Sequence, residues 1–578
     1  MEQKRSTWSS SFTFILAAVG SAVGLGNVWR FPSLCAKHGG GTFLMVYLLL
    51  VFVLGLPLLY MEIAIGRKIK KGAPECMKAI NKHAEPIGWA SVSNAFVISI
   101  YYSVLFAWVI MMCVFSFKFG FMTGPNKTEQ AGNLFNDLSK VTYTIKGFSI
   151  SSIPVLICLI VGLALIYFCI RNGSDSIGKV ISFIVPVPLI CLTIMAIKGM
   201  TLPHAFDGLK QLFIPDWSSL KDFSLWTDAA GQVFYSMSVM MAVMFAYGSF
   251  LPDNSNIVKD GFIIAICDFC VSILSSVVLF TTLYGTGNAD KVTTGGIATA
   301  FIVYPQAIVN LSGNGIINAI FGVIFYLCLG TLSIDSAFSI TEGVSTAISD
   351  KFKINKKKTT FWLVIIGAIP ALLMTTGAGA AILDIMDNWC NAFNIFIIGI
   401  FETIVIGWFF SNKKILNEIN RNTKKVKLPL WWFSATVKII APIGLSILFG
   451  ATIYSLINDK GSYLNGLYGG KDYGLWANLI FGWLFTALVL GSGYIVKLII
   501  KFKKKKGFVE NTVLWEDDNN PIISTKKLTN STNSTKIKET NFTTKEQQEE
   551  LNDLKLMLYN GSITQEEYEI KRKQILNI

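Results

Sequence analysis

Asp335 and Ser336 stand side by side in GTLSIDSAFSITEG (Gly330–Gly343), inside an apolar run of about 35 residues that ends at Asp350. A carboxylate beside a hydroxyl supplies hard oxygen ligands that suit a small cation. Ionisable groups are expensive inside a membrane, so the pair is a candidate ion site. We expect Na⁺, with further ligands from backbone carbonyls where a neighbouring helix unwinds.

Other acidic residues also fall in or beside apolar runs: Glu62, Asp268, Glu342, Glu402, and Asp384 and Asp387 at the start of the tenth run. Each is a functional candidate by the same argument, and pairing for structural reasons is the alternative. For Glu62, Glu342 and Glu402 we expect structural pairing.

The stretch GSAVGLGNVWRFPSLCAKHGGG (Gly20–Gly41) overlaps an uncharged segment, residues 6–29, that is long enough to cross a bilayer. Weak helix formers and polar groups fill its inner half: Gly20, Gly24, Gly26, Asn27, Arg30 and Pro32. Unwound backbone at that depth is tolerated only inside protein or beside a cavity, so it marks a candidate binding site. A small-residue contact face and the core of a signal peptide after Lys4 and Arg5 are the alternatives.

A second interrupted segment, GQVFYSMSVMMAVMFAYG (Gly231–Gly248), follows five apolar runs later, with Gln232, Ser236 and Ser238 near its centre. Broken helices at equivalent positions of two halves are the best sequence indication of an alternating-access site. An odd number of spans per half inserts the second half upside down. A signal peptide would leave this matching segment unexplained, so we drop that alternative.

The composition is that of a polytopic membrane protein. The 578 residues are 52% hydrophobic and only 15% charged, with a mean hydropathy of +0.53. The net charge of +14 does not indicate nucleic acid binding, because the lysines cluster in short loops and in the tail between apolar runs. Most of the ten cysteines stand singly in apolar runs, without metal-ligand spacing, and are expected to pack as small hydrophobes.

Twelve apolar runs predict twelve membrane spans. They are residues 6–29, 42–61, 87–117, 147–170, 180–197, 229–252, 261–287, about 35 residues ending at 350, 359–383, 388–412, 439–458 and 474–496. Basic residues follow the even-numbered spans 2, 4, 8 and 10, which predicts that those loops and both termini are cytoplasmic. A further apolar stretch, Ile297–Leu311, is predicted to form a short helix over the outer face.

The last part of the chain differs in composition. Residues 503–545 are rich in Asn, Thr and Lys and are predicted to be a disordered linker. Residues 546–577 regain helical periodicity, with a stop at Asn560-Gly561 and a capping box from Thr564 to Glu567, and are predicted to form a helical hairpin. The hairpin resembles the short C-terminal domain of many bacterial proteins, which implies oligomerisation or docking. A solvated charged tail is the alternative.

Several motifs together resemble the neurotransmitter:sodium symporter family: AVGLGNVWRFP, Gly39–Gly41, GLPLLYMEIAIGR, Tyr101-Tyr102, GQVFYSMS and IDSAFSITEG. The resemblance covers roughly residues 5–496. It implies an all-α fold with 12 transmembrane helices, built as two inverted five-helix repeats with broken helices 1 and 6, plus two extra helices. The transporter domain would then be residues 1–502, with repeats at about 8–200 and 228–412 and the extra helices at about 432–502.

The resemblance also implies two Na⁺ sites. One would use the carbonyls of Gly20, Val23 and Leu332 with the side chains of Asp335 and Ser336, and the other Ala22, Asn27, Ser236 and Asp268. Substrate would lie between the two breaks, with its carboxylate at the amides of Leu25 and Gly26 and at Tyr102. Its amine would meet the carbonyls of Ala22 and Tyr235 and the region of Ser238, since half-helix ends attract ions of opposite charge.

Gates are implied in the same way. Arg30 and Asp387 resemble an outer ion-pair gate, with Gln232 nearby and Tyr102 and Tyr235 as an aromatic lid. Arg5, Trp8 and Asp350 resemble the cytoplasmic gate. Exposed pairs of this kind are individually weak, which suits an element that opens and closes.

Two positions bear on the ligands. Amine-transporting relatives carry aspartate where this chain has Gly24, so Gly24 predicts a substrate that brings its own carboxylate. Asp268 supplies a fixed negative charge near a Na⁺ site, which predicts that chloride is not required.

The side-chain pocket is expected to be apolar. Its inferred lining is Ile98, Tyr102, Tyr235, Met237, Met241 and Ile340, beside Gly24 and Ser336. Methionine adapts to different shapes, so we favour a neutral hydrophobic or aromatic L-amino acid. The alternative is that the methionines only pack the core. Many relatives have glycines in the sixth break where this chain has Met240, Met241 and Ala242, which leaves the extent of unwinding open.

These patterns predict a Na⁺-coupled symporter for an amino acid in the cell membrane. A symporter for glycine, GABA or another small amino acid is the alternative within that class, and an amino-acid-sensing membrane receptor is the alternative outside it. An enzyme is not expected, because nucleophile, base and metal cluster do not occur at usable spacing.

Overall fold

The computed structural model describes residues 7–149, 151–171, 173–424, 426–458, 467–468 and 471–505, with Trp515, Leu554, Glu567, Tyr568 and Lys571. Contacts divide the chain into two units, Met1–Trp515 and Glu516–Ile578. The predicted hairpin at 546–577 and nearly all of the predicted linker at 503–545 fall outside the described residues, apart from the isolated positions, and so does Arg5. Those assignments stay predictions.

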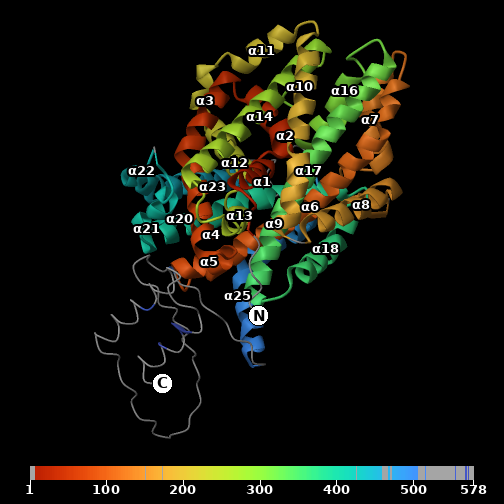
Figure 1. Ribbon diagram of the computed structural model, residues 1–578. Coiled ribbons are helices and arrows are strands. Elements are labelled where there is room, and N and C mark those ends of the chain that lie inside the picture. The colour runs from red at the N-terminus through yellow and green to blue at the C-terminus, as the bar shows by residue number, and fades with distance from the viewer. Residues whose placement is uncertain are drawn as a thin grey trace. The chain divides into compact units, whose positions relative to one another are not determined.

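The first unit is helical (Figure 1). Its first elements are α1 Ser11–Ala22, α2 Leu25–Lys37, α3 Gly41–Leu50, η1 Val51–Gly55, α4 Leu56–Ile69, α5 Ala73–Ile80, α6 Glu85–Phe115, η2 Ser116–Gly120, α7 Lys127–Ser139, η3 Ile145–Ser149, α8 Ile153–Ile170, α9 Ser174–Ile184, α10 Pro186–Met200, α11 Ala205–Phe213 and η4 Trp217–Lys221. The next are α12 Phe223–Ser236, α13 Val243–Ser249, α14 Ile257–Gly285, η5 Ala289–Lys291, α15 Gly296–Ala298, η6 Thr299–Val303, α16 Tyr304–Ile308 and α17 Gly315–Phe352.

The unit continues with α18 Lys356–Leu373, α19 Gly379–Asn388, η7 Trp389–Asn394, α20 Ile395–Phe409, α21 Asn412–Asn420, α22 Leu430–Ala435, η8 Thr436–Ile440, α23 Ala441–Asn458, β1 Leu467–Tyr468, β2 Lys471–Asp472, α24 Leu475–Asn478, η10 Leu479–Leu484 and α25 Phe485–Lys505. The strands β1 and β2 pair antiparallel. The segments η1, η6, η7, η8 and η10 are π-helical turns inside longer helices.

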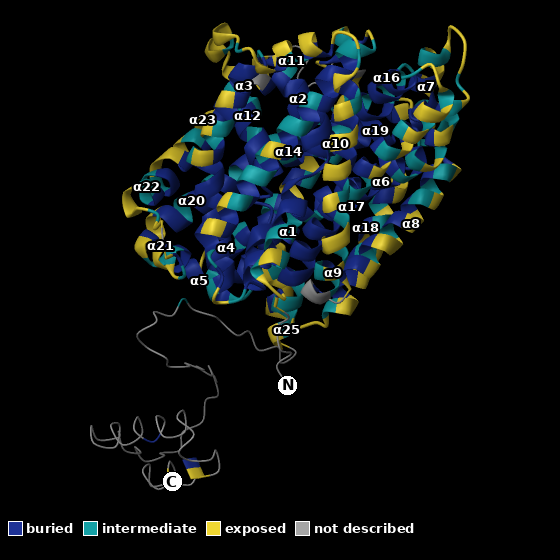
Figure 2. Cartoon of the chain, turned by 45° about the horizontal axis from the view of Figure 1, so that its top comes forward, coloured by how far each residue is buried: buried dark blue, intermediate teal, exposed yellow. Residues whose placement is uncertain are grey.

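Among the described residues, nine helices are long and apolar enough to cross a membrane, and the bent pair α1–α2 makes a tenth candidate. Two further predicted spans are not among these ten. One is divided by Met237–Ala242 into the short helices α12 and α13, and the other is α18, which begins with three lysines. The chain therefore has a helical, multi-pass membrane architecture, and the count of twelve stays a prediction. Figure 2 shows the buried residues gathered inside the first unit and the exposed ones around its outside.

The first break lies where the glycines predicted it. Helix α1 ends at Ala22, α2 begins at Leu25, and the two axes differ by 52°. The freed N–H of Gly24 donates to Oδ1 of Asn27 at 2.9 Å, so a side chain from the next turn replaces the lost helical bond. Most residues of both halves are buried, so both halves pack within the helical unit.

The second break forms without glycine. Ser238, Met240 and Ala242 have φ angles of 52°, 63° and 61°, in the left-handed region that costs other residues about 1–2 kcal/mol each. Long-range hydrogen bonds hold the strained backbone: the N–H of Met240 donates to Oε1 of Glu62 at 2.6 Å, and the hydroxyl of Ser91 donates to the carbonyl of Met240 at 2.9 Å. Glu62 thus has the structural role expected of it.

The other two carboxylates expected to pair differ from each other. Oε1 of Glu342 lies 2.5 Å from Nζ of Lys356, an ion pair between α17 and α18. Glu402 is buried on α20, and within the described part of the chain its Oε1 has no hydrogen-bond partner. The expected structural pairing is therefore present for Glu342. For Glu402, the described residues provide no partner for Oε1.

The boundary between the ninth and tenth spans was predicted wrongly. Helix α18 ends at Leu373, ten residues before the predicted end at Leu383, and α19 already begins at Gly379. The intervening turn is apolar and carries no charge to mark it. The hydroxyls of Thr375 and Thr376 donate to the last carbonyls of α18 and so end the helix. Asp384 and Asp387 consequently lie within α19, not at its start.

The short helix predicted at Ile297–Leu311 is present as a continuous helical stretch, Gly296–Ile308, formed by α15, η6 and α16. It packs against α7 and α17 through buried aromatic rings, including Phe301 stacked on Phe135 with ring centroids 4.6 Å apart.

Candidate functional site

Asp335 lies on α17 against the end of α1. It is 2% exposed, and a Cβ placed on Gly20 would lie 1.8 Å from its Oδ2, so only glycine leaves room for the carboxylate here. Its other oxygen, Oδ1, has no hydrogen-bond partner among the described residues. A buried carboxylate needs a compensating cation or donor, and the broken end of α1 offers carbonyl oxygens beside it. These groups fit a small, hard cation.

Ser336, the next residue of α17, lies against the break itself. Its Oγ is 2.8 Å from the position that a Cβ on Gly24 would take. The sequence-predicted ligands Gly20, Asp335 and Ser336 therefore meet at one place. Val23 lies in the same break, and Leu332 lies one turn before Asp335 on α17, so their carbonyls belong to the same neighbourhood.

A second polar cluster joins the first break to α14. Nδ2 of Asn27 lies 2.8 Å from Oδ1 of Asp268 and 2.8 Å from Oγ of Ser272, and the hydroxyl of Ser236 donates to the same Asp268 oxygen at 2.5 Å. The hydroxyl of Tyr47 donates to the other oxygen, Oδ2, at 3.0 Å. Asp268 is fully buried, so these donors together stabilise a carboxylate in the protein interior. Tyr47 and Ser272 were not predicted.

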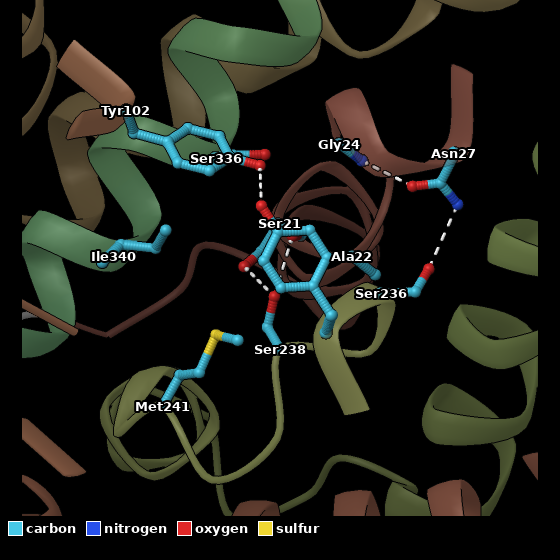
Figure 3. Close-up of a pocket in the computed structure, with 11 residues that line it drawn as sticks. Ser21, Ala22, Gly24, Asn27, Tyr102, Ser236, Ser238, Met241, Ser336 and Ile340 are labelled. Atoms are coloured by element: carbon cyan, nitrogen blue, oxygen red, sulfur yellow. Dashed lines mark hydrogen bonds between the residues drawn. The ribbon is translucent and has the colours of Figure 1, made fainter. Parts of the chain in front are cut away.

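A pocket lies between the two breaks and α17 (Figure 3). Its lining is Ser21, Ala22, Gly24, Asn27, Tyr102, Tyr235, Ser236, Ser238, Met241, Ser336 and Ile340. All but Ser21 were predicted from the sequence. The pocket is narrow: the space open to the centre of a water-sized sphere is about 20 Å³, room for about one water molecule.

Of the residues predicted to bind substrate or to line its pocket, four do not line this pocket: Leu25, Gly26, Ile98 and Met237. Leu25 and Gly26 are the first residues of α2, where the N–H groups have no acceptor within the helix and the helix dipole favours an anion. Tyr235 packs on Gly26, with its Cε1 3.0 Å from the Cβ position. Ile98 is fully buried on α6, one turn before Tyr102.

Three serine hydroxyls meet at the edge of the pocket, and two of them, Ser21 and Ser238, line it. Oγ of Ser21 lies 3.2 Å from Oγ of Ser238, and Ser238 also donates to the carbonyl of Ser21 at 2.9 Å (Figure 3). Oγ of Ser21 also lies 3.0 Å from Oγ of Ser339 on α17. They connect both breaks to α17. Sequence reasoning missed Ser21 and Ser339, and the available signal was weak: Ser21 lies inside the glycine-rich motif, whereas Ser339 looks like any small helix residue.

Two tyrosines close one side of the pocket. The hydroxyls of Tyr102 on α6 and Tyr235 on α12 are 2.5 Å apart, and Tyr102 is 3% exposed. The predicted lid residues therefore touch. Gln232, one turn before Ser236, is fully buried, and within the described residues neither amide atom has a hydrogen-bond partner. Such a group is costly unless another conformation or a ligand satisfies it.

The residues of the predicted outer gate lie near each other without direct contact. The charge of Arg30 acts on Asp387, but the described residues include no ion pair between them within 4.0 Å. Arg30 lies along α12, where its Nη2 is 3.8 Å from the Cβ position of Gly231. The C-terminal end of α2 and the first half of α12 are joined directly, since Nε2 of His38 lies 2.8 Å from Oδ2 of Asp228.

Trp8, a residue of the predicted cytoplasmic gate, is buried. Its indole Nε1 donates to the carbonyl of Tyr247 at 3.0 Å, and its ring contacts those of Tyr247 and Phe250 edge-on. Asp350 accepts a 2.8 Å hydrogen bond from the N–H of Gly72 and lies 3.9 Å from Nζ of Lys71. Trp8 therefore packs on the end of the sixth predicted span, and Asp350 on the segment that follows the second.

Two broken helices with buried oxygen groups around a pocket between them are the features expected of a multi-pass membrane transporter. Residues 5–122 and 122–505 match the model of the sodium:neurotransmitter symporter family. The chain belongs to this family, whose members are sodium-dependent transporters and not enzymes. The resemblance seen in the motifs is thereby confirmed.

Individual relatives agree with this assignment. An uncharacterized sodium-dependent transporter of Methanocaldococcus jannaschii is 32% identical over 87% of this chain and 99% of its own length. The sodium-dependent neutral amino acid transporter B(0)AT3 of Mus musculus is 28% identical over 80% of this chain and 87% of its own. A sodium- and chloride-dependent GABA transporter of Drosophila melanogaster is 27% identical over 90% of this chain and 58% of its own. All three are named as transporters, so the receptor alternative is not supported.

Proposed function

We propose that this protein imports a neutral, hydrophobic or aromatic L-amino acid with Na⁺ by alternating access. The observation that carries the proposal is the Asp335 carboxylate, buried beside Gly20 with its Oδ1 unpartnered among the described residues. An ion site at the end of a broken helix is the arrangement by which transporters couple ions to substrate.

One Na⁺ would bind the side chains of Asp335 and Ser336 with backbone carbonyls of Gly20, Val23 and Leu332. A second would bind at Asn27 and Asp268, with Ala22 and Ser236. The substrate carboxylate would lie at the amino end of α2 and near that second ion, so ion and substrate stabilise each other's binding. This mutual dependence is the physical basis of coupling.

Met241, Ile340 and the ring of Tyr102 form an apolar wall, which supports a hydrophobic side chain. Methionine can move aside for a larger ligand. The small volume of the pocket and its serine hydroxyls favour the second candidate, a symporter for glycine, GABA or another small amino acid. Gly24 agrees with both, because each substrate carries its own carboxylate.

We also propose that transport does not require chloride. The hydroxyls of Tyr47 and Ser236 and the amide of Asn27 already serve the Asp268 carboxylate, and a fixed anion at this point disfavours a second one. The Drosophila relative is named chloride-dependent, so by this proposal the family would contain members with and without a chloride requirement.

In the proposed cycle, Na⁺ and amino acid enter from outside, the tyrosine lid and the Arg30–Asp387 gate close, and the two broken helices tilt together. The inner gate of Arg5, Trp8 and Asp350 then opens. The fold would be two inverted five-helix repeats with two added helices in the plasma membrane, with both termini cytoplasmic. The C-terminal hairpin would serve oligomerisation or docking.

Purified protein in proteoliposomes tests the proposal. An inward Na⁺ gradient should drive accumulation of one or more amino acids, and collapsing the gradient should stop it. A scintillation-proximity binding screen of the common amino acids, with and without Na⁺, identifies the substrate and separates large from small side chains. Binding without Na⁺ dependence, or the absence of gradient-driven uptake, would refute the proposal.

A further inference from the structure

Asn391 lies one turn after Asp387, where α19 changes into the π-helical turn η7. Its Nδ2 donates to Oδ1 of Asp387 at 2.7 Å and lies 3.2 Å from the hydroxyl of Tyr101 on α6. Both hydrogens of the amide are thereby used. One side chain fixes the direction of the Asp387 carboxylate and ties it to a fully buried residue of another helix.

The other end of the same amide has an unused acceptor. Oδ1 of Asn391 is buried and, within the described part of the chain, has no hydrogen-bond partner. A buried carbonyl oxygen without a donor is costly, and native proteins rarely keep one without a reason. A donor that arrives in another conformation would remove that cost.

Arg30 is a cation that can supply such a donor. Its charge acts on Asp387, yet in the described residues the two do not form an ion pair within 4.0 Å. Oδ1 of Asp387 accepts from Asn391, and Tyr101 also bonds to this carboxylate, whose two oxygens can each accept more than one donor. A guanidinium presents its N–H groups as a planar fork that binds two acceptors at once. Oδ2 of Asp387 and Oδ1 of Asn391 are two such acceptors.

We propose that Asn391 is a positioning residue of the outer gate. It orients the Asp387 carboxylate, and it offers its amide oxygen to Arg30 when the outer halves α2 and α12 close onto α19. The inference rests on the proposed alternating access. Asn391 lies in the π-helical turn η7, and such turns are frequent at functional sites.

Hydrogen–deuterium exchange of the full-length protein in nanodiscs tests this without any substrate, in NaCl and in choline chloride. Asn391→Ala should raise amide exchange in Leu25–Lys37 and Phe223–Ser236 about tenfold, the effect of losing one charge-assisted hydrogen bond. Asn388→Ala is the matched control, because Asn388 lies on the same helix and donates only to the carbonyl of Asp384. It should leave both segments unchanged.

A double-mutant cycle separates positioning from general loosening. In an Asp387→Asn background, Asn391→Ala should add less than about twofold, because the two residues act as one unit. Asn391→Gln, which keeps the amide, should restore most of the protection. If Asn391→Ala does not fold, Asn391→Asp, which loses the donor, should show the same increase.

Unchanged exchange in folded Asn391 variants, or fully additive effects with Asp387→Asn, would overturn the inference. The proposed function fails differently. If Na⁺ does not alter amide exchange in the wild-type protein, the proposed coupling to Na⁺ is wrong. The double-mutant cycle measured in choline chloride still decides the role of Asn391.

Discussion

The side-chain amide of Asn27 lies 2.8 Å from the carboxylate of Asp268, and this contact joins the break in the first helix to the middle of α14. The residues are 241 positions apart, and Ser236 from the second break bonds to the same oxygen. The two broken helices and α14 therefore meet at the carboxylate of Asp268.

Asp268→Asn should convert the protein from chloride-independent to chloride-stimulated transport. Removing the fixed charge leaves the hydroxyls of Tyr47 and Ser236 facing a neutral amide, where an anion can replace the lost negative charge. Uptake in sodium gluconate should fall at least about tenfold, while NaCl restores part of it. Asp260→Asn, at the start of the same helix, is the control. Wild-type uptake that already collapses in gluconate would contradict the prediction.

Asp335→Ala should abolish Na⁺-dependent binding, because it removes the charged ligand of the site beside Gly20. Gly20→Ala should have nearly the same effect, since its new methyl would lie 1.8 Å from Oδ2 and push the carboxylate aside. Gly444→Ala makes the same change where the surroundings are open and should be silent. Na⁺ titrations of substrate binding measure all three, and an unchanged Na⁺ response in Asp335→Ala would remove that residue from its role.

Ala242→Gly should raise the free energy of unfolding by about 1 kcal/mol, because glycine tolerates the φ angle of 61° at this position. Ala246→Gly, one turn later inside α13, should lower it by about as much. Both substitutions replace alanine by glycine, but they are expected to change the free energy of unfolding in opposite directions. Thermal unfolding in detergent measures both, and two destabilising outcomes would show that strain at the break is not the controlling factor.

Tyr102→Phe should speed the release of bound substrate by about fivefold to tenfold, because it removes the hydroxyl contact that closes the lid to Tyr235. Tyr304→Phe is the matched control, a buried tyrosine whose hydroxyl has no partner in the described residues. Dissociation of labelled substrate after dilution measures the rate. Equal rates in wild type and Tyr102→Phe would exclude the lid role.

Much of the site could be predicted because its signals are local. Glycines at Gly20 and Gly24, a lone Asp335 in an apolar run and the polar residues of the sixth segment each stand out against their neighbours in the chain. Of the eleven pocket-lining residues, Ser21 alone was not predicted. The positions of the two breaks follow from the same contrasts.

What failed or was missed depends on contacts across the fold. The turn between α18 and α19 carries no local mark, because threonine hydroxyls end the helix in an apolar sequence. Tyr47, Ser272 and Ser339 look like ordinary helix residues until packing brings them to Asp268, Asn27 and Ser21, respectively. Asn391 acquires its meaning only beside Tyr101 and Asp387.

The sequence by itself determined the multi-pass helical architecture and the places of the two breaks, since hydropathy and side-chain chemistry are properties of short segments. Only the tertiary structure decided how the second break exists without glycine. Glu62 and Ser91, far away in the chain, bond to the backbone of Met240 and hold it in a conformation that its own residue type disfavours. Local propensity sets the cost of that conformation, and long-range hydrogen bonds in a buried site offset it.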